Sequence, residues 1–351
     1  MTIVGASAVR VRIPFRRPFA TAAGTWHERD AWILRLHASD GRVGVGEASL
    51  DPAADDAALD DLAAAMRAFV ARGAGGAEPV HATIMGAIQA AKLDLGILTL
   101  DAASPSTTVA VNATVATEDL ERSVGEARSA IERGFTTIKL KGGLERSTGA
   151  LVARLAAIRD AVGPGIALRL DVNGAWDPAT ARDRLAGLAP IHLEYVEQPI
   201  PPGDPEEPED LARLRAASPV PIAADESVSS LADARALLVA RAADVLVVKP
   251  GRVGGPLVAL AIAREAQAAG VGVTISTLLE TGVGLSAALR VAACLPDQAH
   301  GLATADVLVS DLLRQPLEVR NGRMTIPAAG SGALDSAAVR SFQCEGIGDD
   351  R

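Results

Sequence analysis

The sequence predicts an α/β protein in which a closed (β/α)8-type barrel follows an N-terminal α+β domain. From residue 108 onward, eight short runs rich in apolar and β-branched residues recur, and alanine- and leucine-rich segments with helical periodicity lie between them. Most of the runs are spaced by roughly 25–30 residues, the length of one strand, one helix and two loops. Strands that alternate with helices pair in parallel, and eight such units favour a barrel over an open sheet.

Residues 1–107 precede the barrel and have a different character. An antiparallel meander with a turn at Asp40 and Gly41 is predicted by the runs 9–19, 30–39 and 41–50. Helical segments follow at 55–73 and 82–98. We therefore expect an α+β domain, a barrel and a C-terminal segment that returns to the first domain, with boundaries at 1–107, 108–315 and 316–351.

The eight barrel strands are predicted in order along the chain. They are the runs 108–115, 136–141, 166–173, 193–199, 220–226, 243–250, 271–277 and, with weaker character, 299–305. Segments with helical periodicity separate them, for example 120–134, 151–163 and 256–270. An open doubly wound sheet would carry a glycine-rich phosphate-binding turn after its first strand, and the segment 111–120 has none. The proline- and acid-rich stretch 199–210 is interpreted as a solvated loop.

Composition limits the classes of function. The chain has 351 residues, of which 49% are hydrophobic, so it can bury a large core. The net charge is -9 and no basic run occurs, so we do not expect a nucleic-acid partner. We find neither an apolar run long enough to span a membrane nor a secretion signal at the N-terminus. Cys294 and Cys344 fit no metal-binding spacing. We expect a cytoplasmic protein that acts on a small-molecule substrate.

Three acidic residues stand at the ends of successive predicted strands. Asp171, Glu197 and Asp225 close the third, fourth and fifth barrel strands. Active sites of this barrel class lie at the C-terminal ends of the strands, so the three carboxylates should converge at one side of the mouth. One such acid alone could equally be a helix N-cap. Three together favour a hard divalent cation such as Mg²⁺, which prefers oxygen ligands.

Three lysines accompany these acids. Lys139 and Lys141 lie two residues apart in the second strand and therefore point to the same face, while Lys249 ends the sixth strand. A neighbouring cation disfavours the charged form of a lysine, so Lys139 and a metal ion would make Lys141 a better base. Two lysines that extend their amines to solvent at a strand end are the alternative.

The motifs KLK, DVNGAW, EYVEQP, ADES and VVKPGRVGG, taken in this order, resemble those of the enolase superfamily and its muconate lactonizing subgroup. The resemblance covers nearly the whole chain and implies a modified (β/α)7β barrel beneath an N-terminal capping domain. It implies Mg²⁺, with Mn²⁺ able to substitute, held by Asp171, Glu197 and Asp225. A lysine removes the proton next to a substrate carboxylate, which gives an enediolate. By position, Lys141 and Lys249 match the acid/base lysines, and Lys139, Asn173 and Glu226 match supporting residues.

Within the subgroup, the segments AVNATV, TLLETGVGLSAALRVAACLP and HGLATADVL resemble those of the o-succinylbenzoate synthases of menaquinone biosynthesis. This implies syn dehydration of a 2-succinyl-6-hydroxycyclohexadiene carboxylate. N-acylamino acid racemase, dipeptide epimerase and muconate cycloisomerase activities stay open, as does a catalytically silent binding protein. Dipeptide epimerases carry an Asp-x-Asp motif on the eighth strand, where this chain has Thr304 and Asp306.

Substrate contacts are expected from three places. Asn112 on the first strand is either a substrate contact or a turn residue. The backbone N–H groups of Thr281 and Gly282, at the start of an apolar helix, could bind the succinyl carboxylate. Two loops of the capping domain, 19–26 with Thr21 and Trp26 and 47–52, are expected to close over the substrate. The oligomeric state is left open.

Overall fold

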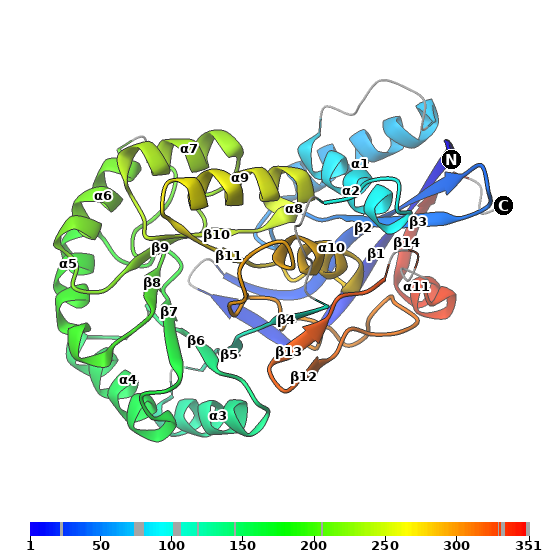
Figure 1. Ribbon diagram of the computed structural model, residues 1–351. Helices are drawn as coiled ribbons and strands as arrows, with labels where there is room; N and C mark the ends of the chain where they lie inside the picture. The colour runs from blue at the N-terminus through cyan, green and yellow to red at the C-terminus, as the bar shows by residue number, and fades with distance from the viewer. Residues whose placement is uncertain are drawn as a thin grey trace.

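The computed structural model describes residues 1–21, 24–73, 81–100, 107–117, 119–143, 145–204, 206–328, 330 and 334–348. Of these, residues 19–21 are described by their backbone alone. Figure 1 shows a curled parallel sheet with helices around its outside and an antiparallel sheet beside it. The fold is thus a barrel with an N-terminal cap, as the sequence predicts.

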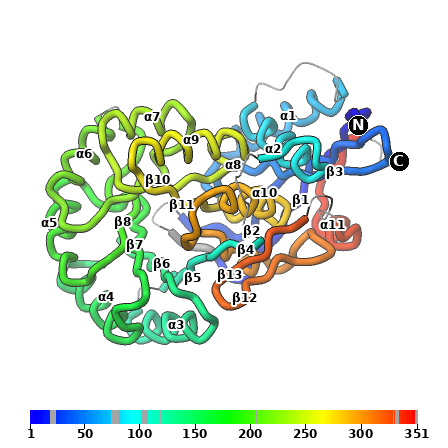
Figure 2. The backbone as a smooth tube through the Cα atoms, viewed as in Figure 1, coloured from blue at the N-terminus to red at the C-terminus, as the bar shows by residue number. Residues whose placement is uncertain are grey.

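The capping sheet is antiparallel and contains both ends of the described chain. Its strand order is β14-β1-β2-β3. The strands are β1 (Ile3–Thr21), β2 (Gly24–Ala38), β3 (Val43–Ala48) and β14 (Gln343–Ile347). Figure 2 shows the C-terminal strand alongside the N-terminal strand, in agreement with the pairing of Ala8 with Ile347. The segment after residue 316 therefore supplies a strand to the sheet that begins the chain.

One face of this sheet is covered by α1 (Asp56–Arg72) and α2 (Ala82–Asp94). Asp55 caps α1 by accepting a hydrogen bond from the backbone N of Ala58. The helix α2 lies directly on β3, because a Cβ at Gly44 or Gly46 would collide with backbone oxygens of α2. The two glycines therefore fix how closely the helices approach the sheet.

The barrel sheet is parallel, with strand order β11-β10-β9-β8-β7-β6-β5. The strands are β5 (Ala113–Val115), β6 (Thr137–Lys141), β7 (Ala167–Asp171), β8 (Tyr195–Glu197), β9 (Ile222–Ala224), β10 (Val245–Val248) and β11 (Gly272–Ile275). Single parallel bridges from Val111 to His300 and from Ser276 to Gly301 link the two edges. The weak eighth run therefore contributes these bridges rather than a regular strand.

Helices connect the strands on the outside of the barrel (Figure 1). They are α3 (Leu120–Glu132), α4 (Thr148–Val162), α5 (Pro178–Gly187), a 3-10 turn (Ala189–Ile191), α6 (Glu207–Ala217), α7 (Leu231–Ala240), α8 (Pro250–Val253), α9 (Pro256–Ala268) and α10 (Gly282–Ala292). The side chains of Asp119, Ser147, Asp177 and Ser230 accept hydrogen bonds from backbone N–H groups at the starts of α3, α4, α5 and α7. Local sequence thus determines where these helices begin.

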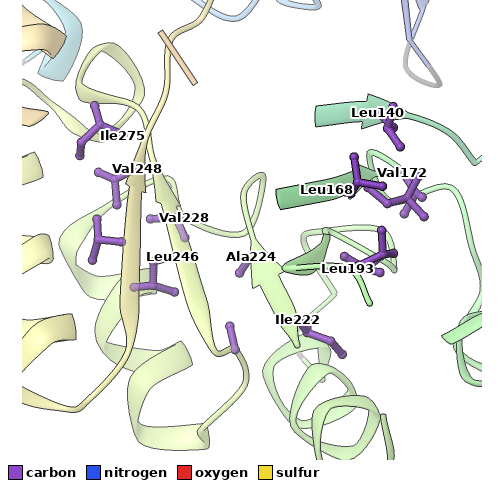
Figure 3. Packing of buried hydrophobic residues seen from close by; sticks show 14 of the residues in the cluster. Leu140, Leu168, Val172, Leu193, Ile222, Ala224, Val228, Leu246, Val248 and Ile275 are labelled. Carbon is purple, nitrogen blue, oxygen red and sulfur yellow. The ribbon is translucent and has the colours of Figure 1, made fainter. Parts of the chain in front are cut away.

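The alternation of side chains along each strand separates two kinds of residue. Apolar residues such as Leu140, Leu168, Ile222 and Leu246 point outward and form the large core between the strands and the helices (Figure 3). The residues between them in sequence face the inside of the barrel, where Tyr195, Ala223 and Val247 form a small cluster of their own. Lys139 and Lys141 alternate with buried Ile138 and Leu140, so both lysines face inward.

After the barrel, the chain forms β12 (Val319–Arg320), β13 (Arg323–Thr325) and α11 (Ser336–Phe342). β12 and β13 make a small sheet with β4 (Thr108–Ala110). The predicted first strand 108–115 is therefore divided between two sheets. Its first part pairs with β13, and its second part, β5, pairs with β6.

The proline- and acid-rich stretch 199–210 is only partly exposed to solvent. The stretch 199–210 is exposed at Pro201 and Pro202, but α6 begins within it and Glu207 is buried at 5% exposure. Its interpretation as a solvated loop is therefore wrong for Glu207, whose partners are inside the fold.

Among the helices that the structure describes, none combines the length and the apolar character that crossing a bilayer requires.

Candidate active site

Charged side chains gather inside the barrel at the C-terminal ends of its strands. We call this group the charged mouth and define it as Lys139, Lys141, Asp171, Glu197, Asp225 and Lys249. Backbone pairing places Lys141 beside Asp171 and Asp171 beside Glu197, so the strand ends are level. The three carboxylate side chains are only 1% exposed. The predicted acids and lysines are therefore brought together.

Lys139 joins two of the carboxylates. Its Nζ lies 2.8 Å from Asp171 Oδ2 and 2.7 Å from Glu197 Oε1. Burial acts to lower the pKa of Lys139, but Asp171 and Glu197 outweigh it and hold the pKa well above its ordinary value. Burial likewise acts to raise the pKa of Asp171, but Lys139 and Lys141 hold it below its usual range. The two carboxylates thus favour the charged form of Lys139.

Lys141 is held by two acceptors at the end of the neighbouring strand. Its Nζ donates to Asp171 Oδ2 at 2.7 Å and to Asn173 Oδ1 at 2.9 Å. Asn173 in turn donates from Nδ2 to Glu226 Oε1 at 2.9 Å. The predicted supporting residues Asn173 and Glu226 thus form a chain of hydrogen bonds that orients Lys141.

Lys249 lies on the other side of the carboxylates, after β10. Its Nζ donates to Asp225 Oδ2 at 2.7 Å. Asp225 Oδ1 accepts from Arg252 Nη1 at 2.8 Å, and Arg252 Nη2 reaches Asp51 of the capping domain at 3.1 Å. Burial acts to raise the pKa of Asp225, but Lys249 and Arg252 outweigh it and hold the pKa low. Asp225 is therefore a carboxylate anion that two cations share.

The donor set fits a hard cation. Asp171, Glu197 and Asp225 are buried oxygen donors on adjacent strands, and Glu197 Oε2 is buried without a hydrogen-bond partner. Burial, and then the Asp171 carboxylate, raise the pKa of Glu197 to about 8, and Lys139 opposes this only in part. Among the described residues, no three candidate ligands are placed as around a bound ion. One oxygen of each of the three carboxylates pairs with a lysine amine instead. The chemistry of the donors fits Mg²⁺, whose binding would require these amines to move.

Comparison with known proteins gives the family. The profile of the family described as Enolase C-terminal domain-like matches residues 122–333, which is more than half of the chain. This chain belongs to the enolase superfamily. The chloromuconate cycloisomerase of Delftia acidovorans is 31% identical to it over 97% of this chain and 99% of that protein. The muconate lactonizing enzyme of Pseudomonas fluorescens, solved in complex with muconolactone, has a TM-score of 0.83 at 27% identity and covers 97% of this chain and 99% of that one. These relatives assign the chain to the muconate lactonizing subgroup of the superfamily.

A further relative is more similar over a shorter range. The o-succinylbenzoate synthase of Thermobifida fusca is 43% identical over 213 residues, which is 60% of this chain. The match spans 64% of the length of that protein. The superfamily is thus clear, whereas the particular reaction is a separate question.

The composition of this superfamily member contains a signal that motif reading did not use. The chain has four lysines among its 34 basic residues, and these are Lys92, Lys139, Lys141 and Lys249. Arginine serves at nearly every other basic position, including the buried ion pairs of Arg154 and Arg169. Lysine is a compact charge whose pKa shifts readily, whereas arginine stays charged. Three of the four lysines thus lie in the charged mouth.

The structure contradicts the expected role of Thr281 and Gly282. Thr281 N and Oγ1 donate to Glu47 Oε2 at 3.1 and 2.6 Å, and Gly284 N donates to the same oxygen at 3.1 Å. Gly282 N donates to Asp311 Oδ1 at 2.9 Å. Two carboxylates of the protein itself therefore satisfy the N-terminus of α10, and no free donors are left there for a succinyl group. Instead, Glu47 ties the predicted capping loop 47–52 to the barrel.

Asn112 belongs to the opposite, N-terminal half of the barrel interior. Its Oδ1 accepts from Arg169 Nη1 at 3.2 Å, and its exposed fraction is 2%. Arg169 also donates to Ala299 O at 2.9 Å and stacks on Tyr195, with 4.9 Å to the ring centroid. We call Asn112, Arg169, Tyr195 and His300 the barrel floor. This placement favours a structural role for Asn112 over substrate contact.

The lid residues are only partly described. Trp26 lies in β2, is partly exposed and packs beside a hydrophobic cluster that includes Phe15 and Leu308. The side chain of Thr21 and the tip of the loop at 22–23 lie outside the described residues. Sequence reasoning missed Arg252 and Asp51, which connect the mouth to the capping domain. The position of Arg252, three residues after Lys249 in VVKPGRVGG, could have indicated it.

Proposed function

We propose that this protein is a Mg²⁺-dependent o-succinylbenzoate synthase, a lyase that dehydrates a 2-succinyl-6-hydroxycyclohexadiene carboxylate. The observation that carries the proposal is the placement of Lys141 and Lys249, each 2.7 Å from a buried carboxylate, with β7, β8 and β9 between their strands. Two amines on either side of an acid cluster suit removal of a proton next to a substrate carboxylate. The 43% identity to an o-succinylbenzoate synthase supports the choice of substrate.

The two lysines have different tasks in this reaction. Lys141 Nζ, in its neutral form, takes the proton from the carbon next to the substrate carboxylate. The electron pair released forms the new double bond as the C–O bond to the hydroxyl breaks, and the same proton returns to that hydroxyl, which leaves as water. Because both transfers take place on one face, one lysine suffices for syn elimination. Lys249 keeps its proton and stabilises the negative charge that develops on the substrate carboxylate.

The acids and their neighbours prepare this site. Mg²⁺ held by Asp171, Glu197 and Asp225 would supply positive charge beside the substrate carboxylate. Lys139 pairs with Asp171 and Glu197 and keeps a second positive charge at the site. Asn173 orients the Lys141 amine through its hydrogen bond at 2.9 Å.

The eighth run of the barrel favours a substrate without a free ammonium group. Thr304 stands two residues before Asp306, and its hydroxyl forms a 3.1 Å hydrogen bond with that of Thr277. Asp306 is exposed. A buried ammonium without an anionic partner would cost several kcal/mol, as an order of magnitude. A dipeptide with a free N-terminus is therefore a poor substrate for this site.

An N-acylamino acid racemase is the second candidate, and the positions of the two lysines favour it as well. Racemisation requires a proton donor and acceptor on each face of the substrate, and Lys141 and Lys249 come from strands on opposite flanks of the acids. N-succinyl amino acids have a similar succinyl group and no ammonium. Slow racemisation of them would be compatible with the same site.

The test is a direct comparison of substrates with and without metal. We expect dehydration of the cyclohexadiene substrate to be fastest, to stop with a chelator and to return with Mg²⁺. Dipeptides should show negligible exchange of the α-proton with deuterium. Full activity in protein shown to be metal-free would refute the metal role. Racemisation of N-succinyl amino acids as the fastest reaction would keep the roles of the residues and replace the proposed substrate.

A further inference from the structure

The acid-rich stretch 199–210 contains one side chain that its composition does not explain. Glu207, in the first turn of α6, is 5% exposed, whereas its neighbour Glu209 in the same turn is exposed. Glu207 Oε2 accepts from Gly203 N at 2.7 Å. Its Oε1 is in hydrogen-bond contact with Ser227 Oγ and accepts from Gln198 Nε2 at 3.3 Å. Glu207 thus points inward, to the strand ends β8 and β9.

Gln198 connects Glu207 to the charged mouth. It directly follows Glu197, is completely buried and has a φ of 44° in the left-handed region. Its Oε1 accepts from the backbone N of Asp225 at 2.9 Å. Its Nε2 donates to Ile200 O at 3.0 Å, besides its bond to Glu207. One side chain therefore joins the end of the strand that carries Glu197 to the backbone of Asp225.

Glu207 is one of the groups that determine which way the Gln198 amide points. A carboxylate can only accept hydrogen bonds, so it faces the NH₂ end of the amide. The oxygen end is then directed to the backbone N of Asp225, which can only donate. A reversed amide would place two acceptors together and two donors together. Glu207 therefore acts together with Ile200 O, which can also only accept, and with the backbone N of Asp225 to hold Gln198 in this orientation.

We propose that Glu207 and Gln198 are positioning residues that hold together the two strand ends carrying Glu197 and Asp225, two of the proposed metal ligands. The inference rests on the proposed Mg²⁺ site and deepens it, because it extends the site to a helix outside the barrel. Residues that orient metal ligands affect metal affinity although they do not touch the ion. The described part of the stretch 199–210 is then a support for the site as well as a surface segment.

The test measures metal binding itself. Mg²⁺ is titrated calorimetrically into chelator-treated protein without substrate, and thermal unfolding of the metal-free protein is recorded. We expect Glu207→Ala to weaken Mg²⁺ binding by at least about tenfold. Glu207→Gln, which keeps the size but has one acceptor fewer, and Ser227→Ala should weaken it less. Glu209→Gln removes an equal charge from the same helical turn at an exposed position and should leave binding unchanged.

The outcomes separate this inference from the proposed function. If the unaltered protein does not bind Mg²⁺, both are refuted. If it binds Mg²⁺ and the folded Glu207 variants bind it equally well, the positioning role alone is refuted, even where their unfolding temperature is lower. Should Glu207→Ala fail to fold, Glu207→Gln and Ser227→Ala decide the matter by the same comparison. Partial recovery of activity at high Mg²⁺ concentration, in a variant that thermal unfolding shows to be folded without metal, would further support positioning.

Discussion

The two halves of the barrel interior are built from the same strands and differ in how their charges are balanced. β7 carries Arg169 and, two residues later, Asp171, while β8 carries Tyr195 and then Glu197. On the barrel floor, the Arg169 guanidinium bonds to Glu194, Asn112 and Ala299 and lies over the Tyr195 ring. At the charged mouth, Glu197 keeps a buried oxygen without a partner. On the barrel floor the Arg169 guanidinium has several hydrogen-bond partners, whereas at the charged mouth one carboxylate oxygen is left that could bind a ligand.

This difference shows how a single fold separates stability from chemistry. A shift of two residues along a strand keeps the side chain inside the barrel but moves it from a closed layer to an open one. The pKa values of all three carboxyl groups of the mouth are shifted from their ordinary values, as is typical of functional sites. Mutations in the two layers should therefore act on different measured quantities.

The largest effect is expected from the mouth lysines. Lys141→Ala should lower kcat by about 10²–10⁴-fold, the usual contribution of a general acid or base, and Lys249→Ala should also abolish most turnover. The fold should persist, because Lys139 still pairs with Asp171 and Arg252 still pairs with Asp225. Kinetics and thermal unfolding of each variant provide the measurement. Lys92→Ala, which alters the one lysine outside the mouth, is the matched control. Near-normal turnover in either variant would remove that lysine from the mechanism.

Substitution of a barrel-floor residue should lower stability and leave turnover nearly unchanged. Arg169→Met should lower the free energy of unfolding by about 2–4 kcal/mol, because it removes several buried hydrogen bonds and a stacking contact. The kcat of the folded fraction should hardly change. Urea unfolding and kinetics at a temperature where the variant is folded test this. Arg213→Met, at an exposed ion pair, should cost about 0–1 kcal/mol. A large loss of kcat in stable Arg169→Met would show that the two layers are not independent.

The floor should also respond to pH through His300. Burial, with a smaller contribution from Arg169, lowers the pKa of His300 to about 3 from 6.5. The unfolded chain therefore binds a proton that the folded chain does not, and stability is lost as pH falls from about 6.5 toward 3, by about 1.4 kcal/mol per pH unit. His300→Asn keeps an acceptor for the backbone N of Ile275 but does not titrate. Its unfolding free energy should fall less steeply between pH 6 and pH 4. Parallel pH profiles would contradict a buried neutral histidine.

The smallest effect is expected from Asn112, and it tests whether this residue belongs to the barrel floor or to the charged mouth. Asn112→Ala should cost about 1 kcal/mol of stability through the lost bond to Arg169 and leave KM for the substrate unchanged. Unfolding and steady-state kinetics are measured on the same preparation. A raised KM at unchanged stability would move Asn112 from the floor to the mouth and restore the substrate contact that its strand position suggested.

The sequence predicted best what depends on periodicity and strand ends. Asp171, Glu197, Asp225 and the lysines follow from alternation along short strands, and this pattern is local. The role of Thr281 could not be predicted, because its backbone N–H and its hydroxyl both donate to Glu47, more than two hundred residues earlier in the chain. The role of Glu207 could not be predicted for a similar reason. The stretch 199–210 has the composition of a loop, and the partners Gln198 and Ser227 lie after β8 and β9. Contacts between segments that are distant in the sequence produce no periodic pattern from which they could be predicted.

The pairing of β1 with β14 has a consequence for biosynthesis. The ribosome produces β1 before every barrel strand and β14 after all of them, yet Ala8 pairs with Ile347 and Val9 with Gly346 in the finished sheet. A nascent chain therefore carries an incomplete sheet edge while the barrel emerges, and such edges invite association with other chains. The barrel can form first, and the sheet that covers it is completed only once translation has passed its last strand.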